Sequence, residues 1–149
     1  MDTNPPSGRS ASRGRPRIDA ADAKRLLDAA PPHALEAEMS LLGAMLVDPK
    51  VIPDVIGIIS QPDDFAKAGH ATIFQHMISL YDTTATVEIV SLVQRLKDHG
   101  VLDDVGGSAY LMDLAEGVAT AANAAEYARL VREKATLREL MVGGRVVAG

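Results

Sequence analysis

The side chains that could do chemistry in this sequence are two pairs of adjacent aspartates and a pair of nearby histidines. The Asp63–Asp64 and Asp103–Asp104 pairs are close in sequence only, so capping and turn roles are expected for them rather than general acid–base catalysis. His70 and His76 are six residues apart, which places them on different faces of a helix and argues against a metal pair. Because no nucleophile–base arrangement is found either, the sequence predicts no catalytic residue and no metal site.

We interpret the glycines as positions where the backbone needs a positive φ angle or where two elements pack too closely for a side chain. A Walker A phosphate loop requires Gly-Lys-Ser/Thr, and no glycine of this chain is followed by lysine. Gly106-Gly107 is therefore predicted to supply positive φ angles in a tight turn between helices. Gly43 lies inside a helical pattern, where glycine costs about 1 kcal/mol relative to alanine, which predicts close helix packing there. No cofactor is expected in the chain, and we do not expect it to hydrolyse ATP by itself.

Composition and charge are those of a cysteine-free globular protein with one basic end. The 149 residues are 47% hydrophobic and 23% charged, with a net charge of −5. Residues 1–17 hold four arginines and one aspartate, a net +3, so the remainder carries −8. An acidic body argues against wrapping nucleic acid. The basic tail could touch nucleic acid or an acidic partner, but a solubilising disordered terminus is the favoured interpretation.

From Pro32 onward, the hydrophobic periodicity of the sequence is helical throughout. Residues 1–30 are predicted to be a disordered basic tail with a short lead-in, and a domain is predicted over residues 31–149. It is all-α and compact, with about six helices, the last of them long. We expect Thr86 to cap the fourth helix, and Glu36 and Glu38 to lie in the first turn of the first. The six helices are predicted at about residues 34–47, 53–60, 71–81, 86–99, 108–116 and 122–147.

His70 stands at the head of the third predicted helix. We favour a structural role, in which its ring bonds backbone groups and fixes the start of the helix.

No apolar stretch is long enough to span a membrane and the first thirty residues lack the apolar core of a signal peptide. We therefore expect a soluble, cytoplasmic protein.

Four groups of residues occur in a fixed order along the chain: Pro31-Pro32 with Glu36-Ala37-Glu38, Leu42-Gly43, Leu46 and Asp48; Asp64-Phe65 with His70 and Ile73-Phe74; Leu102, Gly106-Gly107, Tyr110-Leu111 and Leu114; and Ala121-Ala122-Asn123, Tyr127-Ala128, Val131, Glu133-Lys134 and Arg138. In this order and at near-constant spacing, they resemble the N-terminal domain of DnaB-type replicative DNA helicases. The resemblance covers about residues 31–149. Departures occur where Ala119, Thr120 and Glu88 replace residues usual in the family, and also near His70.

The resemblance implies a function in DNA replication without catalysis by this chain. It implies that the last helix is the first arm of a hairpin through which N-terminal domains pair, as dimers that form a collar on a hexameric helicase. The second arm and the ATPase domain, to which ATP and magnesium would belong, are not expected in the chain, and DNA would be bound only through that domain. Implied partners are a second copy, a DnaG-type primase and a helicase loader.

For self-association the candidate residues are apolar side chains of the last helix, although packing onto their own domain is the alternative for each. The other residues of the family pattern are expected to be structural. The self-association candidates are Val131, Leu137, Leu140 and Met141, and the structural ones are Glu36, Glu38, Gly43, His70, Phe74, Gly106, Gly107, Asn123 and Tyr127.

Two other functions stay open on the sequence alone. One is a stand-alone interaction protein that mimics the helicase collar and competes for the primase or the loader. The other is an enzyme or nucleic-acid binder in its own right, which is disfavoured because no Walker A motif and no catalytic arrangement are found.

Overall fold

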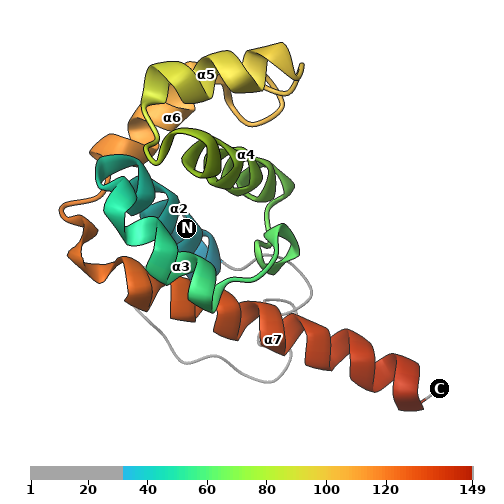
Figure 1. The fold of residues 1–149 in the computed structure, drawn as a ribbon. Helices are drawn as coiled ribbons and strands as arrows, with labels where there is room; N and C mark the ends of the chain where they lie inside the picture. Colours follow the sequence, from blue (N-terminus) through green and yellow to red (C-terminus); the bar gives the residue numbers. More distant parts are fainter. Residues whose placement is uncertain (1–31, 149) are drawn as a thin grey trace, which may run out of the picture.

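The computed structural model describes residues 32–148, and within that range it contains six α-helices, three short 3-10 turns and no strand. The all-α prediction is therefore confirmed. The predicted tail over residues 1–30 lies outside the described residues. Figure 1 shows helix α2 in the middle of the molecule, α7 along one side of it, and α5 at the opposite end.

Helix α2, Pro32–Val47, is the centre of the core. It packs most extensively against α7, Ala124–Ala148, and next against α6, Gly107–Glu116. At the crossing with α6, a Cβ added to Gly43 would overlap the carbonyl oxygen of Leu114. The predicted close packing at Gly43 is therefore confirmed, because two helix backbones meet there without an intervening side chain.

Short turns that begin with proline follow α2. Asp48 follows α2, and its side chain accepts a hydrogen bond from the backbone N–H of Lys50 at 3.1 Å, which caps the 3-10 turn η2, Pro49–Val51. Helix α3, Ile52–Ile58, and the 3-10 turn η3, Pro62–Asp64, come next. Proline suits the first turn of a helix, because the N–H group that it lacks would have no hydrogen-bond acceptor within the helix.

Helices α4, Ala68–Thr84, and α5, Ile89–Asp98, form the far end of the domain. Helix α4 ends at Ala85, whose φ of 60° is left-handed and whose N–H reaches the carbonyl of Tyr81 at 2.7 Å. The residue that caps α5 is Glu88, and it makes no side-chain capping bond.

The predicted cap at Thr86 is therefore wrong. The chain stays extended past Thr86, and Val87 is buried in the core. Burying a valine contributes about 1.5–3 kcal/mol, which exceeds the roughly 1 kcal/mol of a good cap.

The turn into α6 uses the double glycine as predicted. Gly106 has φ 113° and Gly107 has φ 78°, and the N–H of Gly107 donates to the carbonyl of Leu102 at 2.9 Å. Such angles are strained for residues with a Cβ. The 3-10 turn η4, Ala121–Asn123, then leads into α7, and the hydroxyl of Thr120 caps η4 by accepting the N–H of Ala122 at 3.1 Å.

One hydrophobic core runs through all six helices. Among the described residues, three polar or charged side chains are buried with it, namely Glu38, Asp64 and His70. Buried ionisable groups are stable only when paired or hydrogen-bonded, so their partners are of interest. The fully buried apolar side chains include Leu41, Leu42, Met45, Ile52, Ile73, Met77, Leu92, Leu96 and Leu111.

Candidate functional site

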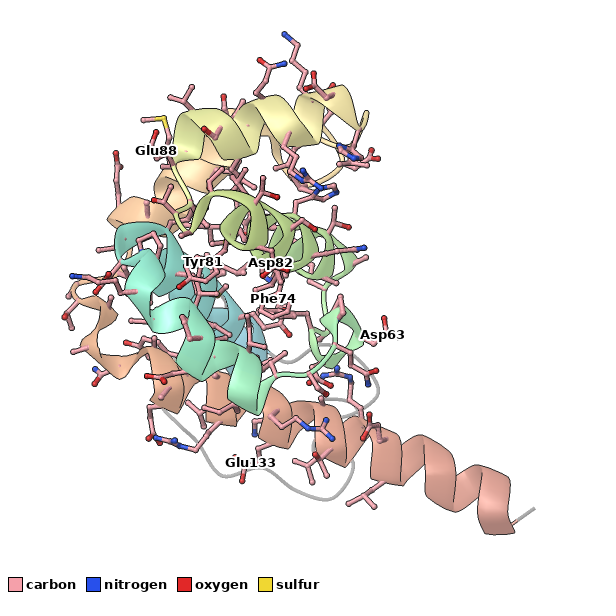
Figure 2. All side chains as sticks on the ribbon, viewed as in Figure 1. Asp63, Phe74, Tyr81, Asp82, Glu88 and Glu133 are labelled. Carbon is pink, nitrogen blue, oxygen red and sulfur yellow. The ribbon has the colours of Figure 1, made fainter. Side chains whose placement is uncertain are left out.

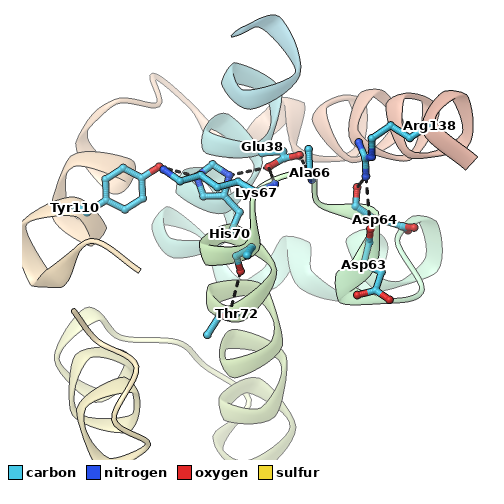
Figure 3. A network of polar contacts seen from close by, with 10 residues as sticks. Glu38, Asp63, Asp64, Ala66, Lys67, His70, Thr72, Tyr110 and Arg138 are labelled. Carbon is cyan, nitrogen blue, oxygen red and sulfur yellow. Dashed lines mark hydrogen bonds and ion pairs between the residues drawn. The ribbon is translucent and has the colours of Figure 1, made fainter. Parts of the chain in front are cut away.

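A chain of polar side chains joins α2, α4 and α6 inside the domain (Figure 3). The Nδ1 atom of His70 lies 2.7 Å from Oε1 of Glu38, and its Nε2 atom lies 2.6 Å from the hydroxyl of Tyr110. The Glu38 carboxylate also accepts the backbone N–H groups of Ala66 and Lys67, at 2.5 and 3.4 Å. Glu38 and His70 are each only 1% exposed. The three side chains thus bridge helices that are far apart in sequence.

The chemistry of these partners fixes the direction of each hydrogen bond. An ionised carboxylate can only accept, so Nδ1 of His70 donates to Glu38. In a neutral imidazole Nε2 then accepts, and the Tyr110 hydroxyl donates to it. Burial, and secondarily the Glu38 charge, raises the pKa of Tyr110, so the phenol keeps the proton that it donates. The Lys67 ammonium lies 4.9 Å from the centre of the Tyr110 ring and covers it with a cation–π contact.

The polar side chains of this network are hydrogen-bonded to one another. Both ring nitrogens of His70 are occupied, and the raised pKa of Tyr110 disfavours a nucleophilic phenolate. The structural role expected for His70 stays a prediction, but its expected partners are corrected: they are side chains rather than backbone groups. The first-turn placement of Glu36 and Glu38 is also wrong, because α2 begins at Pro32.

A second polar cluster fixes α7 to η3. The buried Asp64 carboxylate accepts from the Arg132 guanidinium, with Oδ1 and Nη1 3.1 Å apart. Arg138 donates to the backbone carbonyls of Asp64 and Asp63, at 3.0 and 3.5 Å (Figure 3). Asp64 does lie in a turn as predicted, but its main contact is an ion pair. Arg132, 68 residues away in sequence, carried no local signal of this contact.

The electrostatics of Asp64 are mixed. Burial raises the pKa of its carboxyl, and the Arg132 charge opposes that rise only in part. Its Oδ2 atom makes no hydrogen bond with the described residues. The cluster therefore connects α7 to η3 at an energetic cost to the ionised carboxylate.

Helix α7 has two apolar faces. Ala128, Val131 and Ala135 are buried against the domain. Leu130, Leu137 and Leu140 are 38%, 37% and 65% exposed, and these three leucines are called the outer stripe. At 100° per residue the outer stripe is centred roughly opposite the buried face.

The self-association candidates therefore fall into two groups, one buried and one exposed or half-buried. Val131 is 1% exposed and packs in the core of its own domain, so its assignment to an intermolecular surface is corrected. Leu137 and Leu140 are exposed, and Met141 is half-buried. Leu130, which the sequence interpretation did not single out, joins them on the outer stripe.

Within the described residues, no three His, Cys, Asp or Glu side chains gather closely enough to hold a metal ion. No helix in that part of the chain combines the length and the apolar character needed to cross a membrane.

Comparison with known proteins decides the family. The family model described as "DnaB-like helicase N terminal domain" matches residues 30–133. The chain belongs to this family. Residues 30–133 include five of the six described helices completely and the beginning of α7.

Relatives of this DnaB-like domain include replicative helicases. The chain is 40% identical over 111 residues to the replicative DNA helicase DnaB of Geobacillus stearothermophilus. The aligned region covers 74% of this chain and 24% of the relative. It is 37% identical over 123 residues to the replicative DNA helicase DnaC of Bacillus subtilis, covering 83% and 27%. The chain thus spans about a quarter of the length of the curated relatives it matches.

A solved structure matches as well. The crystal structure of the N-terminal domain of DnaB helicase from Mycobacterium tuberculosis superposes with a TM-score of 0.72 at 39% identity, covering 76% of this chain and 83% of that one. At this identity the likeness extends to sequence as well as to fold. The predicted resemblance to the DnaB N-terminal domain is confirmed.

The remaining family-pattern residues take different positions in this DnaB-like domain. Phe74 is buried, with its ring centroid 4.9 Å from that of Phe65, and points into the interior (Figure 2). Tyr127 is half-buried against the core, while Glu36 and Asn123 are exposed. The family match ends at residue 133, so Leu137, Leu140 and Met141 lie beyond it on α7.

Proposed function

We propose that this DnaB-like domain acts in DNA replication as a non-catalytic module of a replicative helicase, through which copies of the chain associate and a DnaG-type primase docks. The observation that carries the proposal is the outer stripe of α7. Three leucines, spaced seven and then three residues apart, face away from the domain. This spacing is that of a helix–helix seam.

Association of two copies would remove the outer stripe from water. The same helix already holds its domain through its buried face and through the Asp64–Arg132 ion pair. A pair of copies joined along the outer stripe would therefore leave the fold of each domain unchanged. Glu133 lies between the leucines and points away from the domain (Figure 2), so the seam would have a charged residue within it.

Sedimentation of the 149-residue chain tests self-association. We expect the average mass of the wild type to rise with concentration, and the double variant Leu137→Glu/Leu140→Glu to stay monomeric. Val90→Glu is the matched control, because Val90 is 80% exposed on α5, far from α7 in Figure 1. A wild type that stays monomeric at millimolar concentration, or a control that dissociates as completely as the double variant, would reject the role of the stripe.

Primase docking needs its own measurement. We expect the C-terminal domain of a DnaG-type primase from the same cell to bind the chain in titration calorimetry. The same titration with a helicase loader tests the other partner that the family resemblance implies. Absence of primase binding by a chain that self-associates would remove docking from the proposal and leave assembly alone.

A further inference from the structure

Helices α4 and α5 are joined by a polar contact that takes no part in the proposed function. The Nε–H of Arg95 on α5 donates a hydrogen bond to Nδ1 of His76 on α4, at 3.0 Å. His99, just after α5, places its ring against that of His76, with centroids 4.7 Å apart in an edge-to-face arrangement. Its Nδ1 lies 2.9 Å from the carbonyl of Arg95. Arg95 is thus bonded to His76 through its side chain and to His99 through its backbone carbonyl.

This contact exists in only one protonation state of His76. A guanidinium can donate but never accept, so Nδ1 of His76 must carry a free lone pair. A protonated imidazole donates from both nitrogens. It would therefore point an N–H at the Nε–H of Arg95 and add a positive charge beside an existing one. Uptake of one proton by His76 breaks the bond and replaces it by repulsion.

Among the described residues, no carboxylate forms an ion pair with His76 or with Arg95. Arg95 and His99 face His76 from α5, and both disfavour its protonation. The carboxylate nearest to them in sequence, Asp98, accepts a hydrogen bond from Gln94 instead. On α4 itself, His70 and Asp82 are each six residues from His76, and His70 is bonded to Glu38 and Tyr110. Ahead of α6, the backbone of Asp104 and Val105 lies beside Gly69 of α4, about two helical turns from His76.

We propose that the His76–Arg95 contact is a proton-controlled latch, which holds α5 on α4 at neutral pH and loosens it when His76 becomes protonated. Besides the latch, α5 is held chiefly by Leu92 and Leu96, its two fully buried residues. The opening is local for that reason: it exposes two leucines and leaves the packing of α2 against α7 in place.

The direction of the pH effect follows from the environment of His76. Burial, then His99 and Arg95, lower the pKa of His76 below its ordinary value of 6.5. The closed state binds fewer protons than the open one. The latch contributes fully above pH 6.5, and its contribution is lost as pH falls from 6.5 through the lowered pKa.

Hydrogen exchange of the α5 amides at pH 7.5 and 5.0, corrected for intrinsic exchange rates, measures the latch in the 149-residue chain. An NMR titration of the imidazoles gives the pKa of His76 in parallel. Between these two pH values we expect α5 protection to fall by up to about tenfold for each unit by which the pKa of His76 lies below that of the denatured chain. Amides of α2 are expected to keep their protection. Equal α5 protection at both pH values, or a His76 pKa at or above 6.5, overturns the proposal.

Three variants separate the latch from other histidine effects. His76→Gln retains an acceptor for Arg95 but cannot titrate, so α5 protection should no longer depend on pH. Arg95→Met removes the donor and should lower α5 protection at pH 7.5 to the level that the wild type has at pH 5.0. His99→Gln keeps the bond and should keep the pH dependence. Loss of that dependence in His99→Gln, or its persistence in His76→Gln, would assign the effect to another group.

Discussion

At the scale of single residues, Asp64 combines an attractive contact with a costly environment. Its carboxylate pairs with Arg132, a side chain 38% exposed, yet burial dominates and raises its pKa above 3.8. The folded state therefore favours the protonated form. The stability that this group contributes is complete below about pH 3.8 and is lost as pH rises through the raised pKa.

Asp64→Asn tests that sign. The amide resembles the protonated carboxyl, so the variant should gain stability relative to the wild type between pH 3 and pH 7. Urea denaturation at the two pH values measures the difference. Asp63→Asn, at the exposed neighbouring position, is the control and should show no such gain. If the variant instead has a lower free energy of unfolding than the wild type near neutral pH, the ion pair with Arg132 outweighs the cost of burial.

The residue pattern alone names candidate structural side chains, but it does not predict which residues they contact in the fold. The family pattern predicts structural roles for Glu38 and His70, but it does not predict their mutual contact, which joins residues 32 apart. Local periodicity carries no information at that separation. Val131 fits the apolar pattern of a helix surface as well as Leu137 does, and only the packing of α7 on α2 distinguishes them.

At the scale of the elements, the crossing of α2 and α6 depends on one missing side chain. Gly43→Ala places a methyl group where the Leu114 carbonyl oxygen lies, and backbone cannot yield as a flexible side chain can. We expect a loss of about 1–3 kcal/mol in unfolding free energy, even though alanine is the better helix former.

Gly57→Ala is the matched comparison for Gly43→Ala. Gly57 also lies in a helix, α3, but nothing lies within 4 Å of its added Cβ. It should therefore gain up to about 1 kcal/mol. Urea denaturation of both variants gives the two signs. Two gains of similar size would mean that α2 and α6 can separate without cost.

The elements themselves were largely predictable. Helical periodicity gave six helices with bounds that differ from the observed ones by a few residues, and the double glycine gave the turn before α6. The misplaced start of α5 shows the limit, because the capping preference of Thr86 is local while the burial of Val87 depends on the rest of the core.

At the scale of the whole molecule, the two apolar faces of α7 should separate stability from assembly. Val131→Ala removes two methyl groups from the core and should cost about 1–3 kcal/mol in unfolding free energy. It should leave the concentration dependence of the mass unchanged.

Leu140→Ala changes the outer stripe instead, and the opposite result is expected. Its unfolding free energy should stay within about 0.5 kcal/mol of the wild type, while association weakens. Urea denaturation and sedimentation of the two variants side by side measure both quantities. If Val131→Ala lost association at unchanged stability, the buried face would be the intermolecular one and the outer stripe would not.

The 25 residues of α7 make a rod of about 37 Å, and its far end projects beyond the rest of the domain in Figure 1. Arg132 and Arg138 clamp that rod to η3 part of the way along it. A sideways pull on the projecting end therefore acts as a torque on this clamp. The orientation of a protein bound at this end would depend on the contacts of Arg132 and Arg138 with η3. The stiffness of those contacts would then determine how precisely the bound protein is oriented relative to the domain.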